Sequence, residues 1–129
     1  MHYAVMVIDD SPLERFLAET IIKNSQFGEE VISFNSAVEG LAYLESLESD
    51  PERFPDVLFV DIQMPLMNGF QFLDKFMEFP DAIKHKCKIV MYSSTLDDKD
   101  YIRMRRYPVI RKFLTKPLSE EMLRRIDSL

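Results

Sequence analysis

Short runs of apolar residues, each of strand length, alternate along this 129-residue chain with segments of helical periodicity. The runs are apolar throughout, and this pattern is typical of parallel strands that are buried on both faces. Parallel strands need crossover connections, which amphipathic helices provide while covering the sheet. The sequence therefore predicts an α/β fold, a doubly wound sheet of five parallel strands, in one domain that spans residues 1–129.

The expected strands and helices follow from the apolar runs and from capping residues. Strands are predicted at residues 3–8, 30–34, 57–60, 88–92 and 109–114. Helices are expected to begin at the caps Ser11, Ser36, Asn68, Asp97 or Asp98, and Ser119. Ser11 with Glu14, and Ser36 with Glu39, have the spacing of capping boxes. The polar segment 48–55 and the basic segment 84–88 are predicted to be loops.

Composition narrows the class of protein. The formal net charge is −6, and residues 1–61 carry 13 acidic against 3 basic side chains. The single cysteine excludes an internal disulfide and a Cys-rich zinc site, which favours a reducing, cytoplasmic location. The apolar runs are too short to cross a membrane, and no signal peptide follows Met1. A basic run between Arg103 and Lys112 lacks any DNA-binding motif, so no nucleic acid partner is expected.

Polar residues stand where the predicted strands end. The carboxyl ends of parallel strands share one edge of the sheet, which is where ligands bind in such folds. Each residue alone has an ordinary interpretation as a cap, turn former or loop residue. Together they supply carboxylates for Mg²⁺, a carboxylate nucleophile, hydroxyls and a lysine, the groups that a phosphoryl-transfer site needs. These residues are Asp9, Asp10, Asp61, Ser93, Ser94 and Lys116.

These motifs resemble the receiver domain of two-component response regulators, of the single-domain type found in chemotaxis regulators. The similar stretches are VMVIDDSPLER, VLFVDIQMPLMNGF, IVMYSS and FLTKP, and the resemblance extends from Tyr3 to Leu129. It implies a flavodoxin-like fold with the strand order 2-1-3-4-5. It also implies that the domain is a phosphoacceptor in signalling and not an enzyme.

The resemblance assigns a role to each matching residue. Asp61 would accept a phosphoryl group from a phosphohistidine. Mg²⁺ would be held by Asp10 and Asp61, with Asp9 close by, directly or through water, and with the backbone carbonyl of Gln63. Ser93 would donate a hydrogen bond to the phosphoryl group, and Ser94 would offer its backbone amide.

Further implied roles concern the last strand. Lys116 would pair with a phosphoryl oxygen, and its bond to Pro117 would be cis. Phe113 would be the aromatic residue of the switch that responds when Ser93 moves. Gln63 and Thr95 occupy the positions that flank the hydrolytic water in this family.

The sequence departs from the family pattern in two places. The stretch between Asp10 and Asp61 is several residues longer than usual, an excess expected in the 48–55 loop. Ser94 replaces a small apolar residue that is common there.

The sequence is compatible with two other functions. A phosphatase of the haloacid dehalogenase type also uses an aspartate at a strand end, but it needs a second aspartate at position 63, which is Gln. A pseudo-receiver would use the same fold for docking alone.

The resemblance also implies partners. The phosphoryl donor would be a sensor histidine kinase or a histidine phosphotransfer protein. A downstream protein would bind the face formed by residues 97–129, the fourth helix, fifth strand and last helix of this prediction. No effector domain is expected after Leu129, so the chain either docks to its target or is a fragment of a longer regulator. A monomer or weak homodimer is expected.

Overall fold

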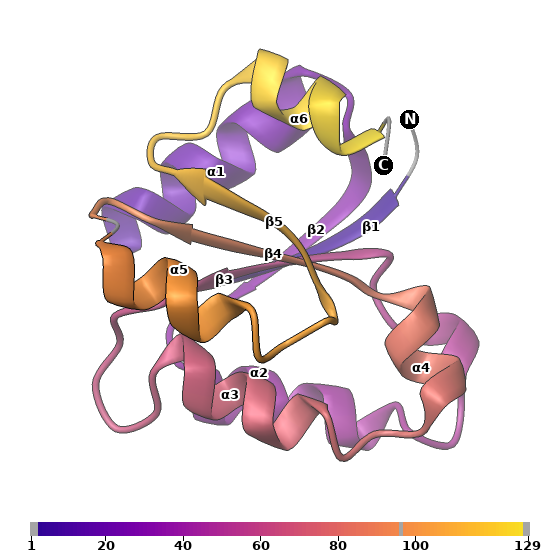
Figure 1. Ribbon diagram of the computed structural model, residues 1–129. Helices are drawn as coiled ribbons and strands as arrows, with labels where there is room; N and C mark the ends of the chain where they lie inside the picture. The colour runs from indigo at the N-terminus through magenta and orange to yellow at the C-terminus, as the bar shows by residue number, and fades with distance from the viewer. Residues whose placement is uncertain (1–2, 96, 128–129) are drawn as a thin grey trace.

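The computed structural model describes residues 3–95 and 97–127. Its sheet has five parallel strands in the order β2-β1-β3-β4-β5, which confirms the predicted fold (Figure 1). The strands are β1 (Tyr3–Ile8), β2 (Gly28–Phe34), β3 (Val57–Asp61), β4 (Lys88–Ser93) and β5 (Ile110–Thr115). The helices are α1 (Pro12–Asn24), α2 (Ala37–Ser46), the 3₁₀ helix η1 (Pro51–Arg53), α3 (Gly69–Phe76), α4 (Asp81–Lys86), α5 (Asp98–Met104) and α6 (Glu120–Asp127).

Helices cover both faces of the sheet, as the apolar central strands β1, β3 and β4 require. The edge strands β2 and β5 also carry charged residues. Helices α1 and α6 lie on one face, and α2, α3, α4 and α5 lie on the other (Figure 1). Alternate residues of each strand enter the two cores: in β1, Val5 and Val7 pack beneath α1 and α6, whereas Met6 and Ile8 pack on the opposite side. This alternation decides which side chains meet at the end of each strand.

The helices start at the predicted caps. The Ser11 and Ser36 side chains accept hydrogen bonds from the amides of Glu14 and Glu39 at 3.2 and 3.1 Å. Asn68 and Asp97 form complete capping boxes with the residues three positions later, so Asp97 rather than Asp98 caps α5. Boundaries shift by one or two residues elsewhere, as at β2 and β5.

The two segments predicted to be loops contain helices. The basic segment is largely part of α4, which begins directly after Pro80, and the polar segment contains η1. Helix α4 has six residues and buries only Ile83, so its sequence carries no helical periodicity to detect. The Lys86 ammonium donates to the carbonyls of Pro51, Glu52 and Phe54, which ties the long loop to α4.

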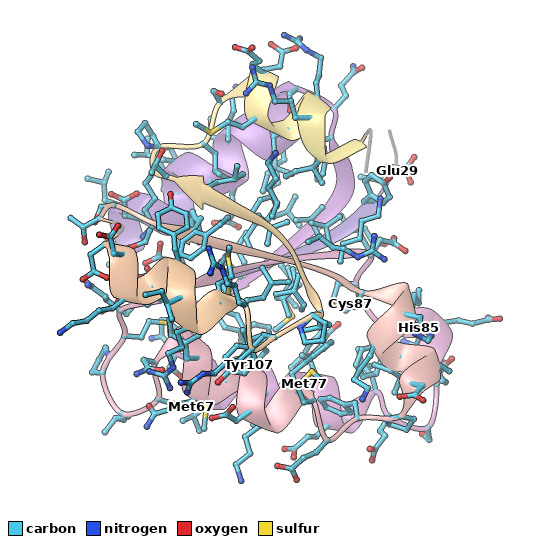
Figure 2. All side chains as sticks on the ribbon, in the orientation of Figure 1. Glu29, Met67, Met77, His85, Cys87 and Tyr107 are labelled. Atoms are coloured by element: carbon cyan, nitrogen blue, oxygen red, sulfur yellow. The ribbon has the colours of Figure 1, made fainter. Side chains whose placement is uncertain are left out.

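Helix α4 leads into β4 and therefore lies toward the amino-terminal ends of the strands. Figure 2 labels His85 on α4 and Cys87 just after it. His85 is exposed and Cys87 is buried in the core. Within the described residues, no helix is long and apolar enough to cross a membrane.

Candidate functional site

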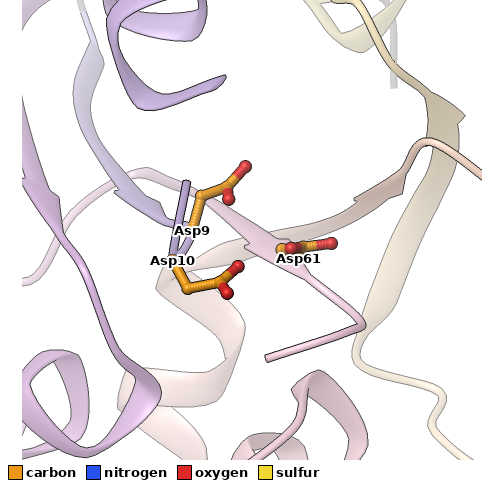
Figure 3. A group of neighbouring side chains, drawn as sticks. All are labelled: Asp9, Asp10 and Asp61. Atoms are coloured by element: carbon orange, nitrogen blue, oxygen red, sulfur yellow. The ribbon is translucent and has the colours of Figure 1, made fainter. Parts of the chain in front are cut away.

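Three carboxylates meet at the carboxyl-terminal edge of the sheet. Strands β1 and β3 are neighbours, with Ile8 paired to Val60, so the residues that follow lie side by side. One oxygen from each of Asp9, Asp10 and Asp61 lies within 4.8 Å of the others, and Figure 3 shows the carboxyl groups extending into a shared space.

Asp9 is fully buried, and both of its carboxylate oxygens are hydrogen-bonded. The Ser11 amide donates to Oδ1 at 2.9 Å. Two donors share Oδ2, the Lys116 ammonium and the Tyr92 hydroxyl, each at 2.7 Å. The Arg15 guanidinium donates to the Asp9 carbonyl at 2.9 Å. These bonds fix the orientation of a buried charge that would otherwise be costly.

Lys116 lies between the two buried carboxylates. Its ammonium is 2.7 Å from Asp9 Oδ2 and 3.5 Å from Asp61 Oδ2, and its side chain is only 7% exposed. The same ammonium lies 4.6 Å from the centre of the Tyr92 ring. The Lys116 amide donates to the Ser93 carbonyl, and its bond to Pro117 is cis. A single cation therefore serves two acidic groups.

Asp61 is 5% exposed. Burial raises the pKa of its carboxyl from 3.8 to about 6; the Lys116 ammonium opposes this rise, and the Asp9 carboxylate adds to it. The group is therefore mostly ionised at neutral pH, as a nucleophile must be. Its Oδ1 accepts a long hydrogen bond of 3.4 Å from the Gln63 amide.

The motif that follows Asp61 contains a glycine, Gly69, and the structure shows why no larger residue fits there. Its amide donates to the Ile62 carbonyl at 2.8 Å, so the start of α3 lies directly against the end of β3. A Cβ at this position would stand 2.5 Å from the Asp61 carbonyl oxygen, closer than side chains pack. Any other residue here would displace the backbone that holds Asp61.

Ser93 is buried at the end of β4, and its hydroxyl bonds to the loop that follows. It donates to the Thr95 carbonyl at 2.9 Å and accepts from the Thr95 amide at 3.3 Å. Ser94 and Gln63 are exposed beside the site. The Ser93 hydroxyl thus lies at the carboxyl-terminal end of β4, with its hydrogen bonds directed to the loop.

Phe113 lies on β5, half-buried against the core beneath α5. Its ring centre is 5.4 Å from that of Tyr101 on α5. A change in its position would therefore be transmitted to α5.

Sequence reasoning missed Tyr92, which it counted only as part of an apolar strand. The side chain is 1% exposed, and burial together with the nearby Asp9 carboxylate raises the pKa of Tyr92, so the hydroxyl keeps its proton. Strand parity is the signal that could have found it. Alternate positions 57, 59 and 61 of β3 lie on one face of the sheet. The register between β3 and β4 pairs Tyr92 with Asp61. A buried phenol there needs a polar partner.

The donor set fits a hard divalent cation. The three carboxylates carry more negative charge than Lys116 can neutralise, and their oxygens are the ligands that Mg²⁺ prefers. Asp10 is exposed and Asp61 faces the same space, whereas the Asp9 oxygens are largely occupied by donors. The acidic pocket is therefore able to bind a metal ion.

Comparison with known proteins identifies similar chains. Residues 5–126 match the response regulator receiver domain family. The chain is 36% identical over 121 residues to protein PilG of Pseudomonas aeruginosa, a match covering 92% of this chain and 80% of PilG. A two-component response regulator of Cytophaga hutchinsonii has the same fold, with a TM-score of 0.89 and 29% identity over 97% of this chain and 93% of that one.

A second group of relatives is much longer. The chain is 35% identical over 118 residues to the protein-glutamate methylesterase/protein-glutamine glutaminase of Thiobacillus denitrificans. This match covers 91% of this chain and 30% of that protein, and for the Agrobacterium fabrum relative the share is 19%. The chain therefore spans less than a third of the length of these relatives.

Proposed function

The chain belongs to the family of response regulator receiver domains, and from this premise we propose that Asp61 accepts a phosphoryl group from the phosphohistidine of a partner protein. An Asp61 oxygen would attack the phosphorus as the bond to the histidine nitrogen breaks, which leaves an acyl phosphate on the chain. The observation that carries this proposal is a buried carboxylate within 3.5 Å of a lysine and beside two further carboxylates.

Mg²⁺ is the proposed cofactor. Asp10 and Asp61 would hold it by carboxylate oxygens, with the Gln63 carbonyl as a further ligand and Asp9 acting directly or through water. When bound, the ion would neutralise the acidic cluster and the charge of an incoming phosphoryl group. The carboxylate set described above supports this assignment.

Three residues would contact the phosphoryl group or report its presence. Lys116 would pair with a phosphoryl oxygen, and the Ser93 hydroxyl and Ser94 amide would donate hydrogen bonds to others. Ser93 would then leave its bonds to Thr95, and Phe113 would move into the vacated space. The contact of Phe113 with Tyr101 supports a change that reaches α5.

The family is a signalling family, and the phosphatase and pseudo-receiver alternatives are not favoured. We propose that the chain catalyses no reaction beyond its own phosphorylation and dephosphorylation, and that residues 1–129 act as one cytoplasmic domain. The phosphoryl donor would be a sensor histidine kinase or a histidine phosphotransfer protein. A kinase relative, the sensor histidine kinase CheAY of Helicobacter pylori, supports this class of partner.

The proposed output face comprises α5, β5 and α6. Strand β5 is an edge of the sheet, with α5 on one side of it and α6 on the other (Figure 1). Within residues 99–125 basic side chains outnumber acidic ones by nine to three. Two of the acids pair with arginines of α6, and α5 itself carries two acidic and two basic side chains. The excess positive charge therefore lies on β5 and on the segment that joins α5 to it, at Arg105, Arg106, Arg111 and Lys112. Such a face favours an acidic downstream protein or weak self-association.

The proposed chemistry is tested by intact mass measurement after incubation with acetyl phosphate and Mg²⁺. We expect one added phosphoryl group in the wild type, none in Asp61→Asn and none with a chelator. Asp56→Asn is the matched control, because Asp56 lies at the opposite end of β3 and bonds the Ala4 amide. A mass increase that survives in Asp61→Asn, or that is indifferent to the chelator, would contradict the assignment.

A further inference from the structure

The Tyr92 hydroxyl is the second donor to an oxygen that Lys116 must leave. Both groups bond Asp9 Oδ2 at 2.7 Å. The proposed function moves the Lys116 ammonium toward a phosphoryl group on Asp61, whose Oδ2 is 3.5 Å away. We propose that Tyr92 is a positioning residue that keeps Asp9 Oδ2 hydrogen-bonded when Lys116 turns to the phosphoryl group. This inference rests on the proposed function.

Burial makes a second donor necessary. Asp9 is fully buried, so bulk water does not replace a donor that departs from Oδ2. A buried carboxylate oxygen without a donor is far more costly than the net gain from an ordinary hydrogen bond. If Lys116 were the only donor to Oδ2, the free energy of that bond would oppose each movement of the lysine. With Tyr92 in place, Lys116 can leave while Oδ2 remains paired.

The Tyr92 ring is held rigidly enough for this task. Its side chain is 1% exposed, and its ring packs edge-on against Phe59 with centres 6.0 Å apart. Phe59 packs in turn against Phe27, so the phenol is anchored in the core beneath α1. The hydroxyl therefore stays with Asp9, and the long, flexible lysine is the donor that moves.

The same contacts keep Asp9 out of direct competition for the metal. Oδ2 has two donors and Oδ1 has one, whereas a carboxylate offers about four lone-pair positions. The carboxylate oxygens of Asp10 and Asp61 are thus the ones most available to Mg²⁺. Removing the Tyr92 hydroxyl should leave Mg²⁺ affinity undiminished, because no metal ligand is lost and Asp9 becomes more available.

The test is Tyr92→Phe, which removes one oxygen and keeps the ring and its packing. We expect the rate of phosphorylation by acetyl phosphate at saturating Mg²⁺ to fall about ten- to a hundredfold, the scale of one hydrogen bond to a charged group. Mg²⁺ affinity of the unphosphorylated protein, measured by titration, should not weaken. The matched control is Tyr107→Phe, which removes a hydroxyl that donates to Asp74 at 2.7 Å on the exposed surface. It should phosphorylate at the wild-type rate.

A double-mutant cycle separates positioning from a general structural effect. In a Lys116→Ala background there is no ammonium to release, so Tyr92→Phe should cause no further fall in the phosphorylation rate. The proposal is overturned by an equal fall in both backgrounds, by a wild-type rate in Tyr92→Phe, or by a parallel loss of Mg²⁺ affinity. If the double variant does not fold, the comparison of rate with Mg²⁺ affinity in the single variant decides. Failure of the proposed function would appear differently, as a wild type that is not phosphorylated.

Discussion

Two lysines, one at each end of the sheet, have ammonium groups with different kinds of partner. At the amino-terminal end, Lys86 donates to three backbone carbonyls, those of Pro51, Glu52 and Phe54. At the carboxyl-terminal end, Lys116 lies 2.7 Å from Asp9 and 3.5 Å from Asp61. An ammonium has three N–H donors, so backbone groups alone can satisfy Lys86. Lys116 instead has partners whose charge and position can change.

The difference teaches where stability and response are located. Carbonyls of η1 and its flanking residue are part of the backbone and hold one arrangement. The carboxylates of Asp9 and Asp61 are side chains, one of which would acquire a phosphoryl group. Lys116 is within reach of both carboxylates, so a phosphoryl group on Asp61 would change the balance between its two partners, as a switch requires.

The largest effect is expected for Lys116→Ala. The fold and Mg²⁺ binding should persist, while the phosphorylation-linked change at Phe113 and α5 is abolished, because no cation then links the phosphoryl group to β5. The readout is the change in amide chemical shifts of α5 on adding acetyl phosphate and Mg²⁺.

The matched variant is Lys86→Ala, which should retain the full response of α5. The contrast between the lysines fails if Lys116→Ala unfolds the unphosphorylated protein or abolishes Mg²⁺ binding. It also fails if both variants lose the response equally.

Asp61→Asn should stabilise the unphosphorylated protein at pH 7.5 in a chelator, by about 1–3 kcal/mol. The pKa of Asp61 is about 6 in the folded state against 3.8 for an ordinary aspartate, so the folded state holds the proton more tightly. That contribution to stability is present below about pH 4 and is lost as pH rises through about 6. The asparagine removes the buried charge, so its advantage should appear at pH 7.5 and shrink toward pH 4.

Urea unfolding at the two pH values measures this difference. Asp56→Asn is the control, since Asp56 bonds the Ala4 amide at the other end of β3 and its loss should not stabilise. An Asp61→Asn protein that is less stable than wild type at pH 7.5 would show that the acidic cluster is not strained.

The sequence predicted the carboxyl-terminal end of the sheet better than the amino-terminal end. Asp9 and Asp61 follow apolar runs directly, and Lys116 follows Phe113 and Leu114 with only Thr115 between. Parallel topology brings strand ends together whatever the loops do. Lys86 gave no such signal. Its partners are backbone carbonyls more than thirty positions away. Every residue has such a carbonyl, so no sequence pattern identifies these three.

Tyr92 shows a second limit. A tyrosine within IVMYSS suits a buried strand by its ring, and nothing local says that its hydroxyl is needed. Only the pairing of β1 with β3, together with that of β3 with β4, places the hydroxyl beside Asp9. Helix caps, by contrast, are local: Ser11 and Ser36 were predicted correctly because each contacts an amide three residues later. Contacts were thus predictable where they are local or where parallel topology brings strand ends together, and they were not predictable where they depend on one side chain within a strand or on backbone carbonyls.

Lys86→Ala should cost about 1 kcal/mol of stability, because the three carbonyls return partly to solvent. The loss should be seen in urea unfolding, with phosphorylation of Asp61 at the wild-type rate. Lys84→Ala is the comparison on the same helix, since Lys84 donates to the Met77 carbonyl and pairs with the exposed Asp81. A reduced phosphorylation rate in Lys86→Ala would mean that the two ends of the sheet are coupled.

The smallest effect is expected for replacing Gln63 and Thr95 together with alanine. Both side chains are exposed beside the site, and the Thr95 contacts with Ser93 are made by its backbone, so stability should not change. Neither group is a carboxylate, so neither can remove a proton from water efficiently at neutral pH. The Gln63 amide can still orient a water molecule, and its loss should slow hydrolysis of the acyl phosphate about threefold, a barrier change of about 0.7 kcal/mol. Decay of the phosphorylated mass after removal of the donor measures this rate. An unchanged rate would show that water reaches Asp61 from a direction that these side chains do not line. The chemistry at the carboxyl-terminal end of the sheet would then depend on the buried groups alone.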